Sequence, residues 1–333
     1  MISTCTRRAV AVFAALALSS SASAAPHALW INRPRTSSPF LAEAVNDVLY
    51  YGGPVISNAK VYAVFWGPNV DAQTQSQVGP FFSNILGSTY MDWLSEYATN
   101  VKAVDGRPGT NQTIGRGTFA GSVTITPANA STNLTDAMIQ SELDAQIAAG
   151  KLAKPDANSL YMIFFPAGVS ISLGSGSTGG GSCSDFCAYH EGFKSPRDGS
   201  SIYYGVMPTC GGVGCGAGFD GLSSTTSHEL IEAVTDPFPT DGSNPSYPQA
   251  WNDNQGNEVA DLCVGGSSTV TGSGLTSTVQ WIWSNTLGAC NQGPWTHGPA
   301  AAVASAVAGL PARPFVAPLL EKLSASPADA FGR

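Results

Sequence analysis

Apolar positions along the chain form short runs that predict buried strands. Residues 61–66 and 160–165 are rich in aromatic and β-branched side chains, and proline or glycine bounds each run, so we predict two buried strands. Residues 118–125 are expected to form a further strand. The pattern over 269–283 predicts a hairpin whose turn lies at 272–274.

Apolar residues at helical spacing predict helices between these strands. Residues 135–149 place their apolar side chains on one face and are expected to be helical. Pro80 suits the first position of another helix, and a second helical piece is expected around 93–97. A helix over 224–235 would end where Pro237 interrupts it.

The pattern divides the chain into four parts. Residues 1–24 have a basic start, an apolar middle and a small-residue end, which predicts a secretory signal peptide cut near Ala24. Residues 25–48 have no period and are expected to be a pro-segment or a strap. Residues 49–292 predict one α+β domain with a mixed sheet, and 293–333 a mobile or processed tail rich in Ala and Pro. No other apolar run approaches the about 20 residues of a membrane span.

Cysteine is concentrated in and after the stretch 172–220, which is rich in Gly and Ser and is expected to be a stapled loop region. Cys5 falls in the predicted signal peptide, and the even set that remains suggests disulfides in an exported chain. The expected pairs are Cys183–Cys187, Cys210–Cys215 and Cys263–Cys290. The alternative is that the two close pairs hold a zinc ion.

Composition and charge exclude several classes of function. Charged residues make up 11% of the chain and the net charge is -8, which argues against nucleic acid or an anionic membrane as partner. The Gly-rich run 174–181 lacks the lysine of a phosphate-binding loop. The chain has no Gly-x-Ser-x-Gly motif, so an α/β serine hydrolase is not expected.

The segment 227–237 carries the most informative motif. On a helix, His228 and Glu232 lie on one face because they are four residues apart. Glu229 follows His228 and points about 100° round the helix. Zinc peptidases use this arrangement, with two metal ligands at i and i+4 and a glutamate as general base. The competing interpretation is an amphipathic helix with a polar outer face.

A catalytic zinc needs a third protein ligand and an open position for water. Glu258 and Asp261 are the leading candidates, because a bridged Cys263 would fix their segment. His190 and Asp236 are alternatives. With zinc bound, the metal would polarise the scissile carbonyl and activate a water molecule, and Glu229 would accept the proton.

Several ordered motifs resemble those of the Exordium-like, phosphate-induced secreted protein family. The similar segments are 51–56, 61–67, 183–190, 228–232, 258–263 and 279–284. The resemblance covers roughly residues 50–290. It implies secretion and an extracellular or cell-wall location, and it supports a grouping of His228, Glu232 and Asp261.

The chain departs from the family pattern at three places. Asp236 precedes Pro237 where an Asn-Pro pair is expected, and the segment 210–215 and the tail after Cys290 have no counterpart. These differences leave the role of the tail and one disulfide unassigned by the resemblance.

We therefore expect a secreted zinc metallopeptidase with a zincin-like fold that acts on polypeptide substrates. The alternative is a non-catalytic extracellular Exordium-like protein that binds cell-wall polysaccharide or acts in signalling. Four tryptophans that could line a sugar groove, or simply pack, motivate the glycan alternative: Trp251, Trp281, Trp283 and Trp295. A third hypothesis is an acid peptidase that uses a pair of carboxylates without metal.

Overall fold

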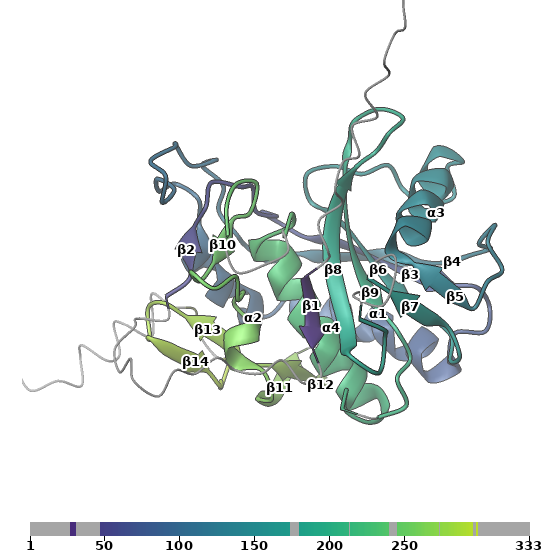
Figure 1. Cartoon of the computed structure of the whole chain (residues 1–333). Coiled ribbons are helices and arrows are strands. Elements are labelled where there is room, and N and C mark those ends of the chain that lie inside the picture. Colours follow the sequence, from purple (N-terminus) through teal and green to yellow (C-terminus); the bar gives the residue numbers. More distant parts are fainter. Residues whose placement is uncertain are drawn as a thin grey trace, which may run out of the picture.

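A mixed sheet forms the centre of the fold (Figure 1). Its strands, in spatial order, are β1 (His27–Trp30), β8 (Phe186–Lys194), β9 (Ser201–Met207), β6 (Ser159–Phe164), β3 (Lys60–Trp66) and β4 (Thr118–Ile125). Strands β9, β6, β3 and β4 are parallel, whereas β8 is antiparallel to β9 and β1 is antiparallel to β8. The predicted mixed sheet is confirmed, and β3, β4 and β6 are the strands expected from the apolar runs.

The structure is a computed structural model that describes residues 27–30, 47–173, 180–212, 214–239, 245–272, 274–295 and 298. The predicted signal peptide (1–24) lies outside these residues, as do most of the segment 25–48 and most of the tail 293–333. Within the described residues, no helix has the length and apolar character of a membrane span.

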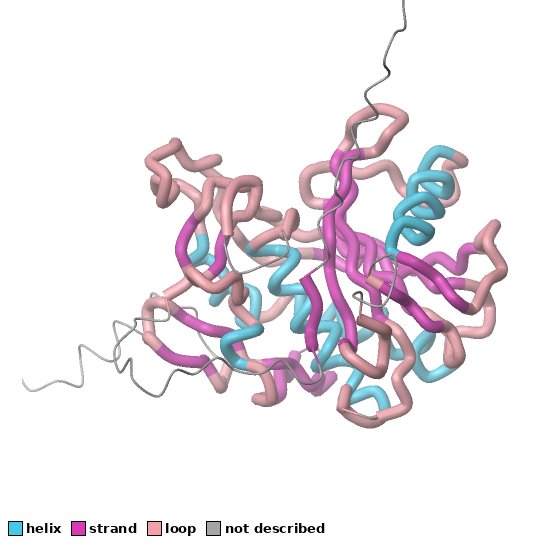
Figure 2. Tube along the Cα trace, in the orientation of Figure 1, coloured by secondary structure: helices cyan, strands magenta, loops and turns pink. Residues whose placement is uncertain are grey.

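Helices cover both faces of the sheet (Figure 2). One face packs against α1 (Ala72–Leu86) and α4 (Gly218–Thr235), and the other against α3 (Asp136–Ala148). Successive side chains of a strand point to opposite faces of the sheet. In β3, Ala63 and Phe65 therefore pack on the side of α1 and α4, whereas Val64 and Trp66 pack on the side of α3. The chain thus has two buried cores, one on each side of the sheet.

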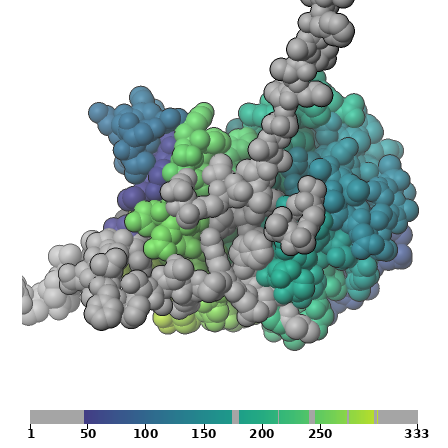
Figure 3. Space-filling model, viewed as in Figure 1, coloured from purple at the N-terminus to yellow at the C-terminus, as the bar shows by residue number. Residues whose placement is uncertain are grey.

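Shorter elements complete the fold. The helical ones are α2 (Thr89–Asp92), η1 (Trp93–Tyr97) and η2 (Asp261–Cys263), and the strands are β2 (Leu49–Tyr50), β5 (Asn133–Thr135), β7 (Ser170–Ser172), β10 (Trp251–Asn252), β13 (Ile282–Ser284) and β14 (Ala289–Asn291). The loop of residues 98–117 projects from one end of the molecule (Figure 3, blue). Its Val104 N–H donates to the Tyr50 carbonyl of β2 at 2.9 Å.

Helix α1 begins earlier than the sequence predicts. The helix starts at Ala72, and Pro80 lies inside it rather than at its first position. The Asp71 carboxylate accepts a hydrogen bond from the Thr74 N–H at 2.8 Å and so caps the first turn. Residues 72–77 are mostly polar, so the first turns carry no apolar period that could have revealed them.

The prediction of a long loop over 172–220 is wrong, because this stretch contains two strands of the central sheet. Strands β8 and β9 form an antiparallel pair, and α4 starts at Gly218 rather than at residue 224. Strand β8 does not form an apolar run in the sequence, because it contains two polar residues, His190 and Glu191, whose side chains are buried.

Two of the expected disulfides are also wrong. The structure pairs Cys183 with Cys210 and Cys187 with Cys215, and only Cys263–Cys290 is as predicted. The antiparallel pairing explains the difference, because it brings the end of β9 beside the start of β8. The segment after β9 therefore lies within bonding distance of Cys183 and Cys187, with Cα–Cα distances of 5.0 and 5.3 Å for the two bridges.

The predicted hairpin over 269–283 is present as β11 (Ser267–Gly272) and β12 (Leu275–Gln280). Residue 273 of its turn lies outside the described residues. Asn84 of α1 anchors the hairpin, since its side-chain amide donates to Ser277 Oγ at 2.9 Å and to the Val270 carbonyl at 3.2 Å. This packing places the last residue of β12, Gln280, against α4.

Candidate metal centre

The motif predicted from the sequence lies on the most deeply buried part of α4. Every residue from Thr225 to Thr235 is buried, because strands β8 and β9 pack on one side of the helix and β12 on another. His228 and Glu229 are 0% exposed and Glu232 is 1% exposed. These side chains therefore do not form the polar outer face of an amphipathic helix.

The ring of His228 is held in one orientation by Gln280. The side-chain amide of Gln280 donates to the Ala260 carbonyl at 2.7 Å, which leaves its Oε1 facing His228 Nδ1 at 2.9 Å. Because Oε1 can only accept, Nδ1 carries the proton and donates. The other ring nitrogen, Nε2, then faces Glu232 Oε2 at 3.1 Å.

His190 of β8 reaches the same group from the sheet. Its Nε2 lies 3.1 Å from the Asp236 backbone carbonyl and 3.5 Å from Glu258 Oε1. Its Nδ1 lies 3.2 Å from Glu229 Oε2 and 3.8 Å from Glu232 Oε2. The sheet and the helix thus each contribute one imidazole to the cluster.

The two carboxylate oxygens of Glu232 have different neighbours. Its Oε1 accepts a hydrogen bond from the Asp261 N–H at 3.0 Å, and its Oε2 faces both histidine rings. The Asp261 carboxylate is further out, with Oδ1 3.9 Å from His228 Nε2. The structure therefore brings the segment that carries Glu258 and Asp261 to the α4 motif.

Two other acidic residues near the motif have structural partners. The Asp236 carboxylate turns toward the following loop, where it accepts from the Ala250 N–H at 2.9 Å and from Asn252 Nδ2 at 2.5 Å. Asp253 closes a turn, since it accepts from the backbone and side chain of Asn257. Asp236 contributes to the cluster through its backbone carbonyl rather than through its side chain.

The cluster carries a large excess of buried negative charge. Its two imidazoles are surrounded by the carboxylates of Glu229, Glu232, Glu258 and Asp261. No lysine or arginine is among the buried residues in the described part of the chain. Buried carboxylates without a counter-charge are costly, so the site calls for a bound cation or for protons.

Burial and the neighbouring charges of the cluster also shift the pKa values of His228, His190 and Glu229. Burial would lower the pKa of His228, but the surrounding carboxylates, Glu232 first, raise it to about 10. Burial likewise opposes charge on His190, yet Glu258 and Glu229 raise its pKa well above the ordinary value. Burial raises the pKa of Glu229, and the hydrogen bond from His190 acts against that rise. The potential in the cluster therefore strongly favours positive charge.

The donor atoms suit zinc. Two overlapping groups, His228–Glu229–Glu232 and His190–Glu232–Glu258, each place three ligand atoms within 4.8 Å of one another. Imidazole nitrogen and carboxylate oxygen are both zinc ligands in proteins. The alternative zinc site on cysteines is wrong, because Cys183, Cys187, Cys210 and Cys215 are all bridged.

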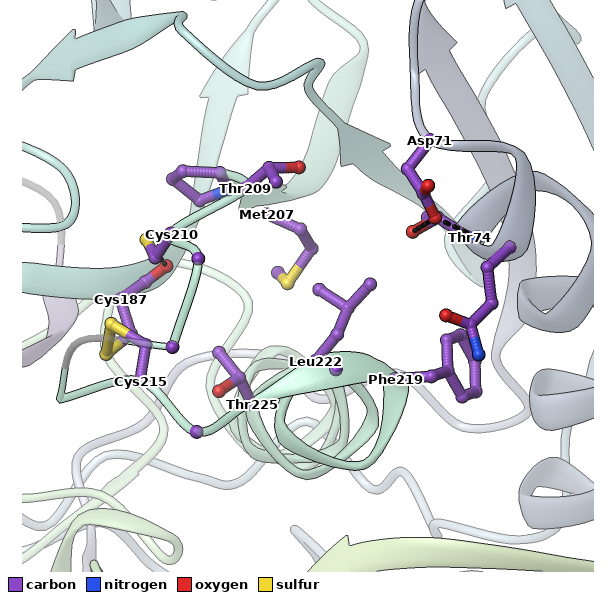
Figure 4. A pocket seen from close by; sticks show the side chains of 16 residues that line it. Asp71, Thr74, Cys187, Met207, Thr209, Cys210, Cys215, Phe219, Leu222 and Thr225 are labelled. Atoms are coloured by element: carbon purple, nitrogen blue, oxygen red, sulfur yellow. Dashed lines mark hydrogen bonds between the residues drawn. A yellow bond between two sulfur atoms is a disulfide. The ribbon is translucent and has the colours of Figure 1, made fainter.

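Pockets open near the amino-terminal half of α4. One, of about 230 Å³, is shown in Figure 4, where Leu222 and Thr225 point from α4 toward it and the Cys187–Cys215 bridge lies at its edge. A second pocket, of about 460 Å³, is lined by Thr225 and by Gln280. Gln280 therefore separates this pocket from the buried ring of His228.

The four tryptophans belong to the packing. Trp251, Trp283 and Trp295 are each 8% exposed, and the ring of Trp281 lies over Gly266. Three of the four are buried and Trp281 is partly buried, and this packing gives no support to a tryptophan-lined sugar groove.

Comparison with family models, with curated proteins and with solved structures found no match to this chain. The resemblance to the Exordium-like family therefore stays a prediction from the motifs. Gln280 was not foreseen from the sequence, because an amide at the end of a strand has no spacing that marks it as a histidine partner.

Proposed function

We propose that this protein is a secreted zinc-dependent metallopeptidase whose site is built on α4 in a zincin-like arrangement. The observation that carries the proposal is the convergence of His228 Nε2 and Glu232 Oε2, 3.1 Å apart and one helical turn apart in the interior. These two side chains would hold the metal. The disulfides support export, since such bonds persist in oxidising compartments.

When bound, the metal would polarise the scissile carbonyl and lower the pKa of a water molecule. Glu229 is placed to accept the proton of that water. Its Oε2 is anchored by His190 Nδ1 at 3.2 Å, and its Oε1 is buried without a hydrogen-bond partner in the described residues. Burial raises its pKa toward the working range of a general base.

A second candidate is a non-catalytic extracellular protein stabilised by a closed metal site. The observation that favours it is burial, because His228 and Glu229 are 0% exposed. Structural zinc sites are closed, whereas catalytic ones keep a position open. In this case the protein would bind metal without hydrolysing peptides.

The test compares Glu229→Gln with the matched control Glu142→Gln, a buried glutamate on α3. The mature protein, purified without chelator, is assayed for zinc per chain and for cleavage of an unfolded protein substrate. We expect about one zinc per chain, and a loss of about 100-fold or more in rate for Glu229→Gln, which should retain its metal.

The control variant should cleave like the wild type. An active Glu229→Gln variant, or a wild type that takes up no zinc, rules out the metallopeptidase. A wild type that holds zinc tightly but cleaves nothing supports the second candidate.

A further inference from the structure

We infer that His190 is the third protein ligand and that it completes a His₂Glu metal site with His228 and Glu232. This inference rests on the metal site proposed for α4 and identifies its remaining member. Two histidines and a glutamate form a ligand set of catalytic zinc in peptidases.

In each of the three side chains, one polar atom is hydrogen-bonded to a group outside the proposed metal position. His228 donates through Nδ1 to Gln280 Oε1 at 2.9 Å. His190 lies with Nε2 at 3.1 Å from the Asp236 carbonyl, which can only accept, so Nε2 carries the proton. Metal-binding histidines characteristically donate their second N–H to an oxygen acceptor in this way.

One nitrogen of each histidine faces Glu232, which is the residue shared by the two overlapping groups of ligand atoms. Glu232 Oε1 is held by the Asp261 N–H at 3.0 Å, which directs Oε2 to the histidines. That oxygen lies 3.1 Å from His228 Nε2 and 3.8 Å from His190 Nδ1. The two ring nitrogens therefore face one carboxylate oxygen, and a cation bound to that oxygen would take the place of the protons that this charged environment favours.

The two carboxylates favoured from the sequence are placed to orient these ligands. Glu258 Oε1 lies 3.5 Å from His190 Nε2, and an oxygen of Glu258 is also within 4.8 Å of one of Glu232. Asp261 holds Glu232 through its backbone N–H, while its own carboxylate oxygen Oδ1 is 3.9 Å from His228 Nε2. Carboxylates behind a metal-bound histidine commonly fix its tautomer and raise its basicity.

The assignment also leaves Glu229 outside the ligand set. Its Oε1 has no hydrogen-bond partner among the described residues, and its carboxylate is within 3.2 Å of His190 Nδ1. A glutamate beside the metal, but not needed to hold it, is what a general base requires.

The test measures Zn²⁺ affinity of the mature protein by competition with a chromophoric chelator. The variants are His190→Asn, Glu258→Gln and Asp261→Asn, and circular dichroism checks that each is folded. We expect His190→Asn to weaken binding by more than about 100-fold, and the two carboxylate variants by about 10- to 100-fold, the range for residues that orient ligands.

Zinc K-edge X-ray absorption of the wild type provides a readout that needs no variant, and two imidazole ligands are expected. One imidazole, or normal affinity in His190→Asn with loss in Asp261→Asn or Glu258→Gln, overturns the assignment of His190 and leaves the α4 site standing. A wild type that binds no Zn²⁺ removes the α4 site as well.

Discussion

Gln280 Oε1 lies 2.9 Å from His228 Nδ1, and this contact decides which ring nitrogen faces Glu232. Replacing Gln280 with Leu removes the acceptor and frees the ring to adopt the other tautomer. We expect Zn²⁺ affinity to fall by about 10- to 100-fold, as measured by chelator competition. The matched control is Gln77→Leu on the exposed side of α1, which should bind like the wild type. Equal affinity in both variants would contradict the role of Gln280.

Zinc binding should strengthen as pH rises. The carboxylates around His228 raise its pKa to about 10, so the metal-free ring holds an extra proton at neutral pH. Zinc must displace that proton, and affinity should therefore rise about tenfold per pH unit below pH 10 for each proton released. Titration calorimetry at pH 7 in buffers of different ionisation enthalpy counts the protons. Affinity that is constant between pH 6 and 8 would be inconsistent with this charge distribution.

Removal of the metal should lower stability. Zinc that binds only the folded chain adds about 2.7 kcal/mol at a free concentration of 100 times Kd. Denaturant unfolding with zinc and with a chelator measures the difference, which should vanish in His228→Asn. A chelator that leaves the wild-type midpoint unchanged would show that folding does not depend on the ion.

The metal-free protein should also respond to pH in a defined direction. The folded pKa of His228 lies above the unfolded value of 6.5, so the protonated ring stabilises the fold fully below pH 6.5. That contribution is lost as pH rises from 6.5 through about 10. The unfolding free energy of the metal-free wild type should fall over this window more than that of His228→Asn.

Peptide mapping without reduction should recover three linked pairs. We expect Cys183 with Cys210, Cys187 with Cys215, and Cys263 with Cys290. Removing the second bridge by a double Cys→Ser change should cost about 2 to 5 kcal/mol of unfolding free energy. Recovery of peptides linked between Cys183 and Cys187 would refute the pairing.

Gly266 should not tolerate a side chain. A Cβ atom at this position would lie 2.0 Å from the ring of Trp281, so Gly266→Ala should cost about 1 to 3 kcal/mol through overpacking. Gly87→Ala is the control, because its nearest contact would be an ordinary 3.5 Å and its backbone is helical. Thermal unfolding of the two variants compares them directly, and equal midpoints would disprove the close contact.

The sequence predicted the parts of the fold that have a plain hydrophobic period. Strands β3 and β6 were located because their apolar residues form unbroken runs, and helix α3 because Ile139, Leu143 and Ile147 recur at helical spacing. Strand β8 was missed because His190 and Glu191 interrupt its apolar pattern, although both are buried. Their polarity is explained by three-dimensional partners that no local pattern records.

The site was predicted in part for the same reason. The spacing of His228, Glu229 and Glu232 is a local property of one helix, so the sequence shows it directly. The position of His190 depends on how β8 packs against α4. The position of Gln280 depends on how the hairpin of β11 and β12 packs against the same helix. Such relationships join segments far apart in the chain, and only the fold reveals them.

The two bridges at the start of β8 lie close to the site, and we expect assembly of the site to depend on their oxidation. Cys187 is three residues before His190, and its bond to Cys215 holds this end of the strand against the segment that leads into α4. In a reducing cytosol these bonds do not persist. We expect the reduced chain to lack an ordered His190 and to take up zinc poorly until the bridges form. Refolding with and without a reductant, followed by zinc uptake, would show whether maturation is timed in this way.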